Sequence, residues 1–130
     1  MSAPALVLNA TSLRLAVCRY APDATLPGIA LLRGTTFWSI TRTPDELSIV
    51  CDEDRVPEGD VKIERGWGAF SVQGPLPFGL TGVISGITAP LADAGVPVFV
   101  VSTYLTDWLL VKHTDFARAR AILAERFEVR

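Results

Sequence analysis

The sequence contains two similar β-hairpin patterns, and this internal repeat constrains the fold more than any other feature. Trp38 to Val50 (WSITRTPDELSIV) and Phe99 to Val111 (FVVSTYLTDWLLV) align without a gap at an offset of 61 positions. Each copy reads as an apolar strand, a short turn containing Thr and Asp, and a second apolar strand. A solenoid needs at least about three units to bury a continuous core, so a single repetition predicts two small α+β modules instead.

The second half of the chain predicts a strand, a helix and a hairpin in succession. Gly68 to Gln73 alternates as a half-buried strand does, and a loop rich in Gly and Pro follows it. Apolar residues at three- and four-residue spacing predict a helix from Leu80 to Ala94. Gly95 stands where a left-handed helix cap is usual. Val96 to Thr103 and Trp108 to Lys112 form the hairpin of the repeat.

A second helix and a last strand complete this module. Thr114 or Asp115 is expected to cap the helix, and Phe127 to Arg130 is expected to be a short strand. The order β-α-β-β-α-β is that of the ferredoxin-like split βαβ unit. Pro90 lies inside the first helix, four residues after Gly86, so a kink is expected there rather than a break.

The first half has the same strands but reduced helices. Leu13 to Arg19 matches the opening strand, and Val61 to Arg65 is expected to be the last. Between them, Pro and Gly residues leave room for at most one or two helical turns, around Ile29 to Arg33. The sequence therefore predicts an α+β chain of two ferredoxin-like modules, residues 1–65 with eroded helices and residues 66–130 complete.

Composition excludes several classes of function. The chain has 130 residues and a formal net charge of −2, without a basic stripe, so a nucleic acid is not an expected partner. No apolar run approaches the ~20 residues that cross a membrane, and the first residues lack the basic region of a signal peptide. The expected location is cytoplasmic, with no membrane partner.

Candidate catalytic and metal-binding groups are few. The two cysteines, Cys18 and Cys51, lie in apolar strand-like runs and are expected to be buried, reduced thiols. The one histidine, His113, is expected at the surface or at a helix start. The sequence shows no nucleophile motif, phosphate-binding glycine signature or metal-ligand spacing, so it predicts no enzyme, no cofactor and no metal.

Binding is better supported, at two places. The loop Gly74 to Gly82 leads to a helix start, whose backbone N–H groups suit a carboxylate. Asp107, in the second hairpin, offers a carboxylate to an ammonium or guanidinium group. In each case a purely structural role as loop or turn stays open. Spacing alone does not place Asp107 against the helix start.

The segment GLTGVISGITAPLADAGVPVFVVSTYLTDWLLVKHTDFARARAIL (Gly79 to Leu123) resembles the ACT domains of small bacterial tandem-ACT proteins. These are similar to aspartate kinase regulatory domains and to the CASTOR-type arginine sensors. The runs VCRYAPDATLP and FWSITRTPDELSIVC resemble their opening module. The resemblance implies a regulatory protein that binds an amino acid where two modules meet. No kinase catalytic domain is present, so it implies no aspartate kinase activity.

The resemblance also implies the residues of the site. The glycine-containing loop matches at Gly79, Thr81 and Gly82, and the Thr-aromatic-x-x-Asp turn matches at Thr103, Tyr104 and Asp107. With their neighbours, the candidate ligand-binding residues are Gly79, Leu80, Thr81, Gly82, Val83, Ser102, Thr103, Tyr104 and Asp107. The arginine sensors have four modules and this chain two, so a composite site needs the eroded module or a homodimer. The alternative function is a structural dimerisation module that regulates a protein partner without a ligand.

Overall fold

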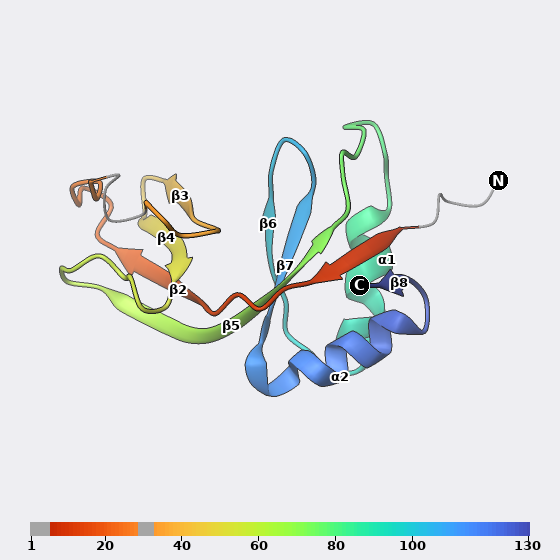
Figure 1. The fold of residues 1–130 in the computed structure, drawn as a ribbon. Coiled ribbons are helices and arrows are strands. Elements are labelled where there is room, and N and C mark those ends of the chain that lie inside the picture. Colours follow the sequence, from red (N-terminus) through yellow and green to blue (C-terminus); the bar gives the residue numbers. More distant parts are fainter. Residues whose placement is uncertain (1–5, 29–32) are drawn as a thin grey trace. The chain divides into compact units, whose positions relative to one another are not determined.

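The fold is that of a computed structural model, which describes residues 6–28 and 33–130 (Figure 1). Its elements in chain order are β1 (Val7–Ala10), β2 (Leu15–Tyr20), β3 (Ser39–Arg42), β4 (Leu47–Asp52), β5 (Lys62–Val72), α1 (Val83–Asp93), β6 (Phe99–Ser102), β7 (Asp107–Lys112), α2 (His113–Ala124) and β8 (Glu128–Val129). The chain divides into two compact units: unit 1 is Met1–Ser12 with Gly68–Arg130, and unit 2 is Leu13–Trp67. None of the described helices is long and apolar enough to span a bilayer.

Unit 1 contains the predicted βαββαβ order, running from the end of β5 through α1, β6, β7 and α2 to β8 (Figure 1). The order of its strands across the sheet is β6-β7-β5-β1-β8. The α+β class is therefore confirmed. Val61 to Arg65 and Gly68 to Gln73 were expected as separate strands, which is wrong: both lie largely within the continuous strand β5.

The N-terminal strand β1 is the element of unit 1 that the sequence pattern missed. It lies between β5, to which it is antiparallel, and β8, to which it is parallel. Leu8 is fully buried in the core of this unit, and its carbonyl accepts a 2.8 Å hydrogen bond from the Arg130 N–H. Residues 6–12 therefore pack with the C-terminal module, in contrast to the expected division at residue 65.

One face of the unit 1 sheet carries the core, and both helices pack on that face. Every second residue of β5 and β7 points into it, as the two-residue period of a strand requires. The buried members are Leu8, Phe70, Val72, Ile87, Leu91, Val96, Leu109, Val111, Ala119 and Leu123. The Phe70 ring stacks on Phe116 of α2, with centroids 4.3 Å apart. Gly68 makes room for this stack, because a Cβ atom there would lie 2.6 Å from the Phe116 ring.

The two helices of unit 1 do not start where the sequence predicted: α1 starts later and α2 starts earlier. Helix α1 begins at Val83 instead of Leu80, runs through Pro90 without a break, and ends as predicted. Gly95 has a φ of +73°, and the Val96 N–H bonds to the Leu91 carbonyl at 2.9 Å. Helix α2 begins at His113 with no capping side-chain hydrogen bond, so the expected cap at Thr114 or Asp115 is wrong.

Unit 2 is an antiparallel sheet in the order β3-β4-β2-β5. Among its described residues there is no helix, in line with the expectation of reduced helices. Most of the helical turns expected around Ile29 to Arg33 fall outside the described residues, and Arg33 itself lies in a turn. One face of the sheet carries a small apolar cluster: Ala16, Cys18, Tyr20, Leu47, Ile49 and Cys51.

The two hairpins of the repeat are the same structure, but the alignment at an offset of 61 is wrong by one residue. Ile40 pairs with Ile49 in the first hairpin and Val100 pairs with Leu109 in the second, which gives an offset of 60. The turns repeat as well. In the first turn the Thr43 N–H donates to the Glu46 carbonyl at 2.9 Å, and in the second turn the Thr103 N–H donates to the Thr106 carbonyl at 2.8 Å. A slip of one residue matters because it exchanges the two faces of a strand.

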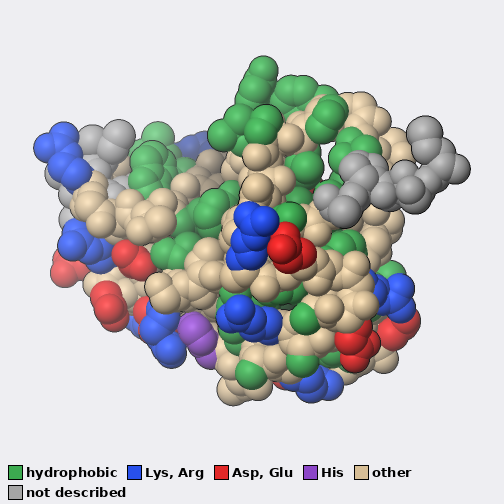
Figure 2. Space-filling view, turned by 45° about the vertical axis from the view of Figure 1, so that its right-hand side comes forward, with side chains coloured by type: hydrophobic (Ala, Val, Ile, Leu, Met, Phe, Trp, Pro, Cys, Tyr) green, Lys and Arg blue, Asp and Glu red, His purple; other side chains and the backbone are tan. Residues whose placement is uncertain are grey.

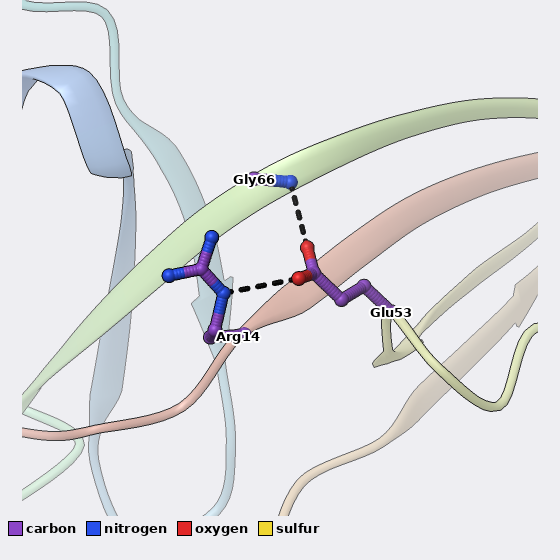
Figure 3. Close-up of polar contacts among 3 residues, drawn as sticks. All are labelled: Arg14, Glu53 and Gly66. Carbon is purple, nitrogen blue, oxygen red and sulfur yellow. Dashed lines mark hydrogen bonds and ion pairs between the residues drawn. The ribbon is translucent and has the colours of Figure 1, made fainter.

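The carboxylate of Glu53 stabilises a β-bulge in unit 2 (Figure 3). Between the pairs Leu15↔Trp67 and Val17↔Glu64, strand β5 has one residue too many. Gly66 takes up this residue with a φ of +83°, a backbone conformation that favours glycine. Glu53 Oε2 accepts a 3.1 Å hydrogen bond from the Gly66 N–H, and its Oε1 accepts one of 3.0 Å from Arg14 Nε.

We expect Glu53→Ala to destabilise the protein by about 1–2 kcal/mol, because the partly buried Gly66 N–H loses its acceptor. The ion pair itself adds little, since the Arg14 side chain is 59% exposed. Chemical denaturation followed by circular dichroism measures the change. Glu58→Ala, at an exposed loop position, is the control and is expected to shift stability by less than about 0.5 kcal/mol. Equal effects of the two substitutions would contradict this role of Glu53.

Candidate functional site

Unit 1 contains a cavity of about 650 Å³ between the loop before α1, the first turns of α1 and the β6–β7 turn. Its lining residues are Leu76, Pro77, Phe78, Leu80, Gly82, Val83, Ile84, Ser85, Thr88, Ser102, Thr103, Tyr104, Leu105, Thr106 and Asp107. The lining is mostly apolar with a few polar groups, as in small-molecule sites generally. Asp107 is its one charged side chain.

The start of helix α1 forms one wall of this cavity. Gly82 precedes the helix with a φ of +79°, a conformation that a side chain rarely adopts. No side chain caps the helix, and its first turn contains no acidic residue. The first intrahelical bond runs from the Gly86 N–H to the Gly82 carbonyl at 3.0 Å, so the N–H groups before it lie ahead of the helical ladder. Such a helix start favours an anionic group.

The β6–β7 turn forms the opposite wall. Thr103 holds the turn closed, since its N–H and its hydroxyl both donate to the Thr106 carbonyl, at 2.8 and 3.1 Å. Thr106 Oγ1 donates to the Val72 carbonyl at 2.5 Å, which ties the turn to β5. Asp107 Oδ1 accepts a 2.7 Å hydrogen bond from Ser102 Oγ. The turn thus fixes the orientation of a carboxylate at the edge of the cavity.

The loop before α1 and the β6–β7 turn contact each other directly. The Leu76 N–H donates to the Leu105 carbonyl at 2.8 Å. The rings of Phe78 and Tyr104 meet edge to face, with centroids 4.9 Å apart. Gly74 permits this approach, because a Cβ atom at that position would lie 2.9 Å from the Leu105 carbonyl oxygen. Each loop is therefore held in place by the other.

Seven of the nine candidate residues named from the sequence line this cavity: Leu80, Gly82, Val83, Ser102, Thr103, Tyr104 and Asp107. Thr81 lies instead at a smaller hollow of about 120 Å³, with Leu6, Gly86 and Phe127. Gly79 lines neither. Their role in ligand binding stays a prediction. The sequence reasoning missed Phe78 and Leu105, although large apolar residues in two predicted loops were a signal that these loops pack together.

No second charged side chain stands beside Asp107 in the cavity lining, whose other ionisable group is the phenol of Tyr104. His113, at the start of α2, does not line the cavity and packs beside Phe116, with ring centroids 6.1 Å apart. Among residues 6–28 and 33–130, no three His, Cys, Asp or Glu side chains gather as metal ligands would. The charged group that the described lining offers to a ligand is therefore a single carboxylate.

Unit 2 has a cavity of its own, of about 750 Å³. It lies over the face of the sheet that carries Tyr20, Leu47 and Ile49, and the loop 54–60 closes one side of it. The Tyr20 hydroxyl donates to the Pro57 carbonyl at 2.5 Å. Burial raises the pKa of Tyr20 to about 12, so the phenol stays protonated at physiological pH.

Comparison with known families identifies the class of protein. A family model described as an ACT domain matches residues 62–125. A separate model, described as an N-terminal domain, matches residues 14–59. The C-terminal part of the chain is therefore an ACT domain, which confirms the resemblance seen in the sequence. Because a different model matches the N-terminal part, the interpretation of unit 2 as an eroded ACT module stays a prediction.

Two curated relatives are similar to most of the chain. The human protein CASTOR3P is 31% identical over 107 residues, a match that covers 72% of this chain and 64% of that protein. The cytosolic arginine sensor for mTORC1 subunit 1 of Bos taurus is 30% identical over 103 residues, covering 72% of this chain and 31% of the sensor. The chain thus matches less than two thirds of either relative's length.

Two solved structures are similar along nearly the whole chain. A protein from Agrobacterium tumefaciens is 38% identical, with a TM-score of 0.86 and coverage of 98% of this chain and 94% of that one. The regulatory subunit of aspartate kinase from Thermus thermophilus has a TM-score of 0.63 at 13% identity, covering 93% and 97% of the two chains. At that identity the second likeness concerns the fold alone.

Proposed function

We propose that this chain is a non-catalytic regulatory protein that binds an amino acid in the cavity of unit 1. The observation that carries the proposal is the pairing of two complementary groups across one cavity: the uncapped start of α1 and the Asp107 carboxylate. An amino acid has the matching pair, since its carboxylate suits the helix start and its ammonium group suits Asp107.

The chemistry of the cavity narrows the ligand to a class. Asp107 fits the α-ammonium group of any amino acid, and equally the cationic end of lysine or arginine. One relative is named as an arginine sensor, which favours a basic amino acid. The apolar residues of the lining, among them Leu80, Val83 and Leu105, suit the aliphatic part of such a side chain.

We propose further that the protein acts as a homodimer in the cytoplasm, with the ligand held where two ACT modules meet. Exposed apolar side chains at the mouth of the cavity support pairing: Phe78 is 76% exposed, Tyr104 79% and Leu105 60%. Figure 2 shows hydrophobic side chains gathered at its top, where Figure 1 has the β6–β7 turn and the loop before α1. Among the described strands, β6 pairs with β7 alone, and an edge strand of this kind is a common place for pairing with a second copy.

The same exposed cluster favours a second candidate function, a dimerisation module that regulates a protein partner without a ligand. A large apolar patch on a small domain generally marks a surface for another protein. The two functions differ in one property: only the ligand-binding protein changes its stability when an amino acid is added. Sedimentation velocity with and without amino acids shows whether pairing depends on them.

Thermal unfolding against the twenty amino acids tests the leading proposal. A ligand at 100 times its dissociation constant is expected to stabilise the fold by about 2.7 kcal/mol, a shift that is easy to measure. We expect a selective hit, confirmed by isothermal titration calorimetry. A flat response across the panel, combined with a stable dimer, would favour the dimerisation module instead.

A further inference from the structure

The cavity of unit 2 has the size of a small-molecule site, and the proposed amino acid site does not use it. Its volume of about 750 Å³ lies within the range of roughly 300–1,000 Å³ that is usual for ligand pockets. In unit 1 two helices cover the apolar face of the sheet, whereas the described residues over the apolar face of unit 2 are loops. Leu47 and Ile49 lie beneath the cavity, and the half-buried Ala24, Pro27 and Val56 line it.

The two loops that wall this cavity are each attached to the sheet by a hydrogen bond. On one side, the Tyr20 hydroxyl donates to the Pro57 carbonyl in the loop after β4, at 2.5 Å. On the other side, Arg42 Nη2 of β3 donates to the Ala24 carbonyl in the loop after β2, at 2.6 Å. A ligand therefore meets walls that are already in place, which lowers the cost of ordering them on binding.

The charged side chains of the lining favour a cation. They are Asp54, Arg55, Glu58 and Asp60, all exposed. Three carboxylates accompany one guanidinium, so the lining has a surplus of two negative charges. Arg55 Nη1 donates to the Arg33 carbonyl at 3.3 Å, whereas the three carboxylates make no hydrogen bond or ion pair with another described side chain. They are free to pair with a cationic ligand.

The spacing of these carboxylates favours an extended organic cation over a metal ion. Within residues 6–28 and 33–130, no three acidic, His or Cys side chains lie close enough together to hold a metal. The carboxylates are thus distributed around the cavity instead of converging on one point. A ligand that reaches more than one of them needs length, and the apolar residues between them suit methylene groups.

We infer that the cavity of unit 2 binds an aliphatic diamine. Its methylene chain lies against the apolar residues, and its two ammonium groups pair with carboxylates of the lining. Two positive charges match the surplus of two negative ones. An amino acid fits this cavity less well, because its own carboxylate is repelled and the lining contains no helix start to receive it.

The test is calorimetric titration of the full chain with cadaverine, a diamine with five methylene groups. The matched ligand is ε-aminocaproate, which has the same chain with one ammonium group replaced by a carboxylate. We expect cadaverine to bind one per chain and at least about tenfold more tightly than ε-aminocaproate. No binding of cadaverine, or equal binding of the two, would overturn the inference. So would full displacement by an equal concentration of Mg²⁺, since that result indicates only a charged surface.

Removal of the three carboxylates tests the place of binding. The triple variant Asp54→Asn, Glu58→Gln, Asp60→Asn keeps the size of each side chain and removes its charge. We expect at least about tenfold weaker binding of cadaverine, because exposed ion pairs are individually weak but three are lost together. Circular dichroism checks that the variant is folded, and the comparison of ligands on the wild type stands without it.

A second triple variant, Asp45→Asn, Glu46→Gln, Glu125→Gln, is the control with the same change in net charge. None of these residues lines the cavity, so we expect cadaverine binding to stay within about twofold. Equal losses in the two triple variants would overturn the inference. Asp107→Ala is also expected to leave cadaverine binding unchanged, and a loss there would place the diamine in unit 1 instead. A silent amino acid panel leaves these results unaffected.

Discussion

Asp107→Ala is expected to weaken binding of the best amino acid ligand by about 10- to 100-fold. A charge-assisted hydrogen bond is worth about 1.5–3 kcal/mol, and each 1.4 kcal/mol is a factor of about ten in affinity. Asp107 is the one charged side chain in the cavity lining, so no neighbouring carboxylate in that lining replaces it. Isothermal titration calorimetry on the wild type and the variant measures the loss.

Asp45→Ala is the matched control for this substitution. Asp45 is an exposed residue in the turn of the first hairpin, in unit 2, and it does not line the unit 1 cavity. We expect its replacement to leave the affinity unchanged. If the affinity also survived Asp107→Ala, the ligand would not use this carboxylate and the proposed site would be wrong.

Phe70→Ala is expected to have the largest effect on stability, a loss of about 3–5 kcal/mol in the free energy of unfolding. Phe70 is fully buried in the core of unit 1, and its ring stacks on Phe116 with an angle of 7° between the planes. Alanine removes both the buried apolar area and the stacking partner. Urea denaturation followed by circular dichroism measures the change.

Phe78→Ala makes the same chemical change at an exposed position. Its side chain is 76% exposed and contacts Tyr104 at the mouth of the cavity. We expect a loss of stability below about 1 kcal/mol, the value of an aromatic pair. A small effect of Phe70→Ala, no larger than that of Phe78→Ala, would contradict the described core.

Some elements of unit 1 were predictable because their signals are local. The apolar stripe of α1 needs only a 3.6-residue period, and Ile87 and Leu91 of that stripe are indeed buried. Gly95 ends the helix because few other residues adopt its positive φ. The strands of the hairpins follow equally from their apolar runs. Their exact alignment did not, since similar residues at neighbouring positions fit an offset of 61 as well as the observed 60.

Other elements depend on pairing between distant segments. Strand β1 has one fully buried residue, Leu8. A single buried position gives no periodicity, so the sequence does not indicate that β1 lies between β5 and β8. The bulge at Gly66 likewise looks like the end of a strand in the sequence. Only its partner across the sheet, together with the Glu53 carboxylate, shows that β5 continues through it.

The sequence by itself determined the α+β class, the order of elements in the C-terminal module and seven of the fifteen residues that line its cavity. The tertiary structure decided that Asp107 lines the same cavity as the start of α1, and that β1 lies between β5 and β8. The physical reason is the distance along the chain over which each signal acts. Periodicity and helix caps act over a few residues, whereas a cavity or the pairing of distant strands is made by contacts that only the folded backbone brings within reach.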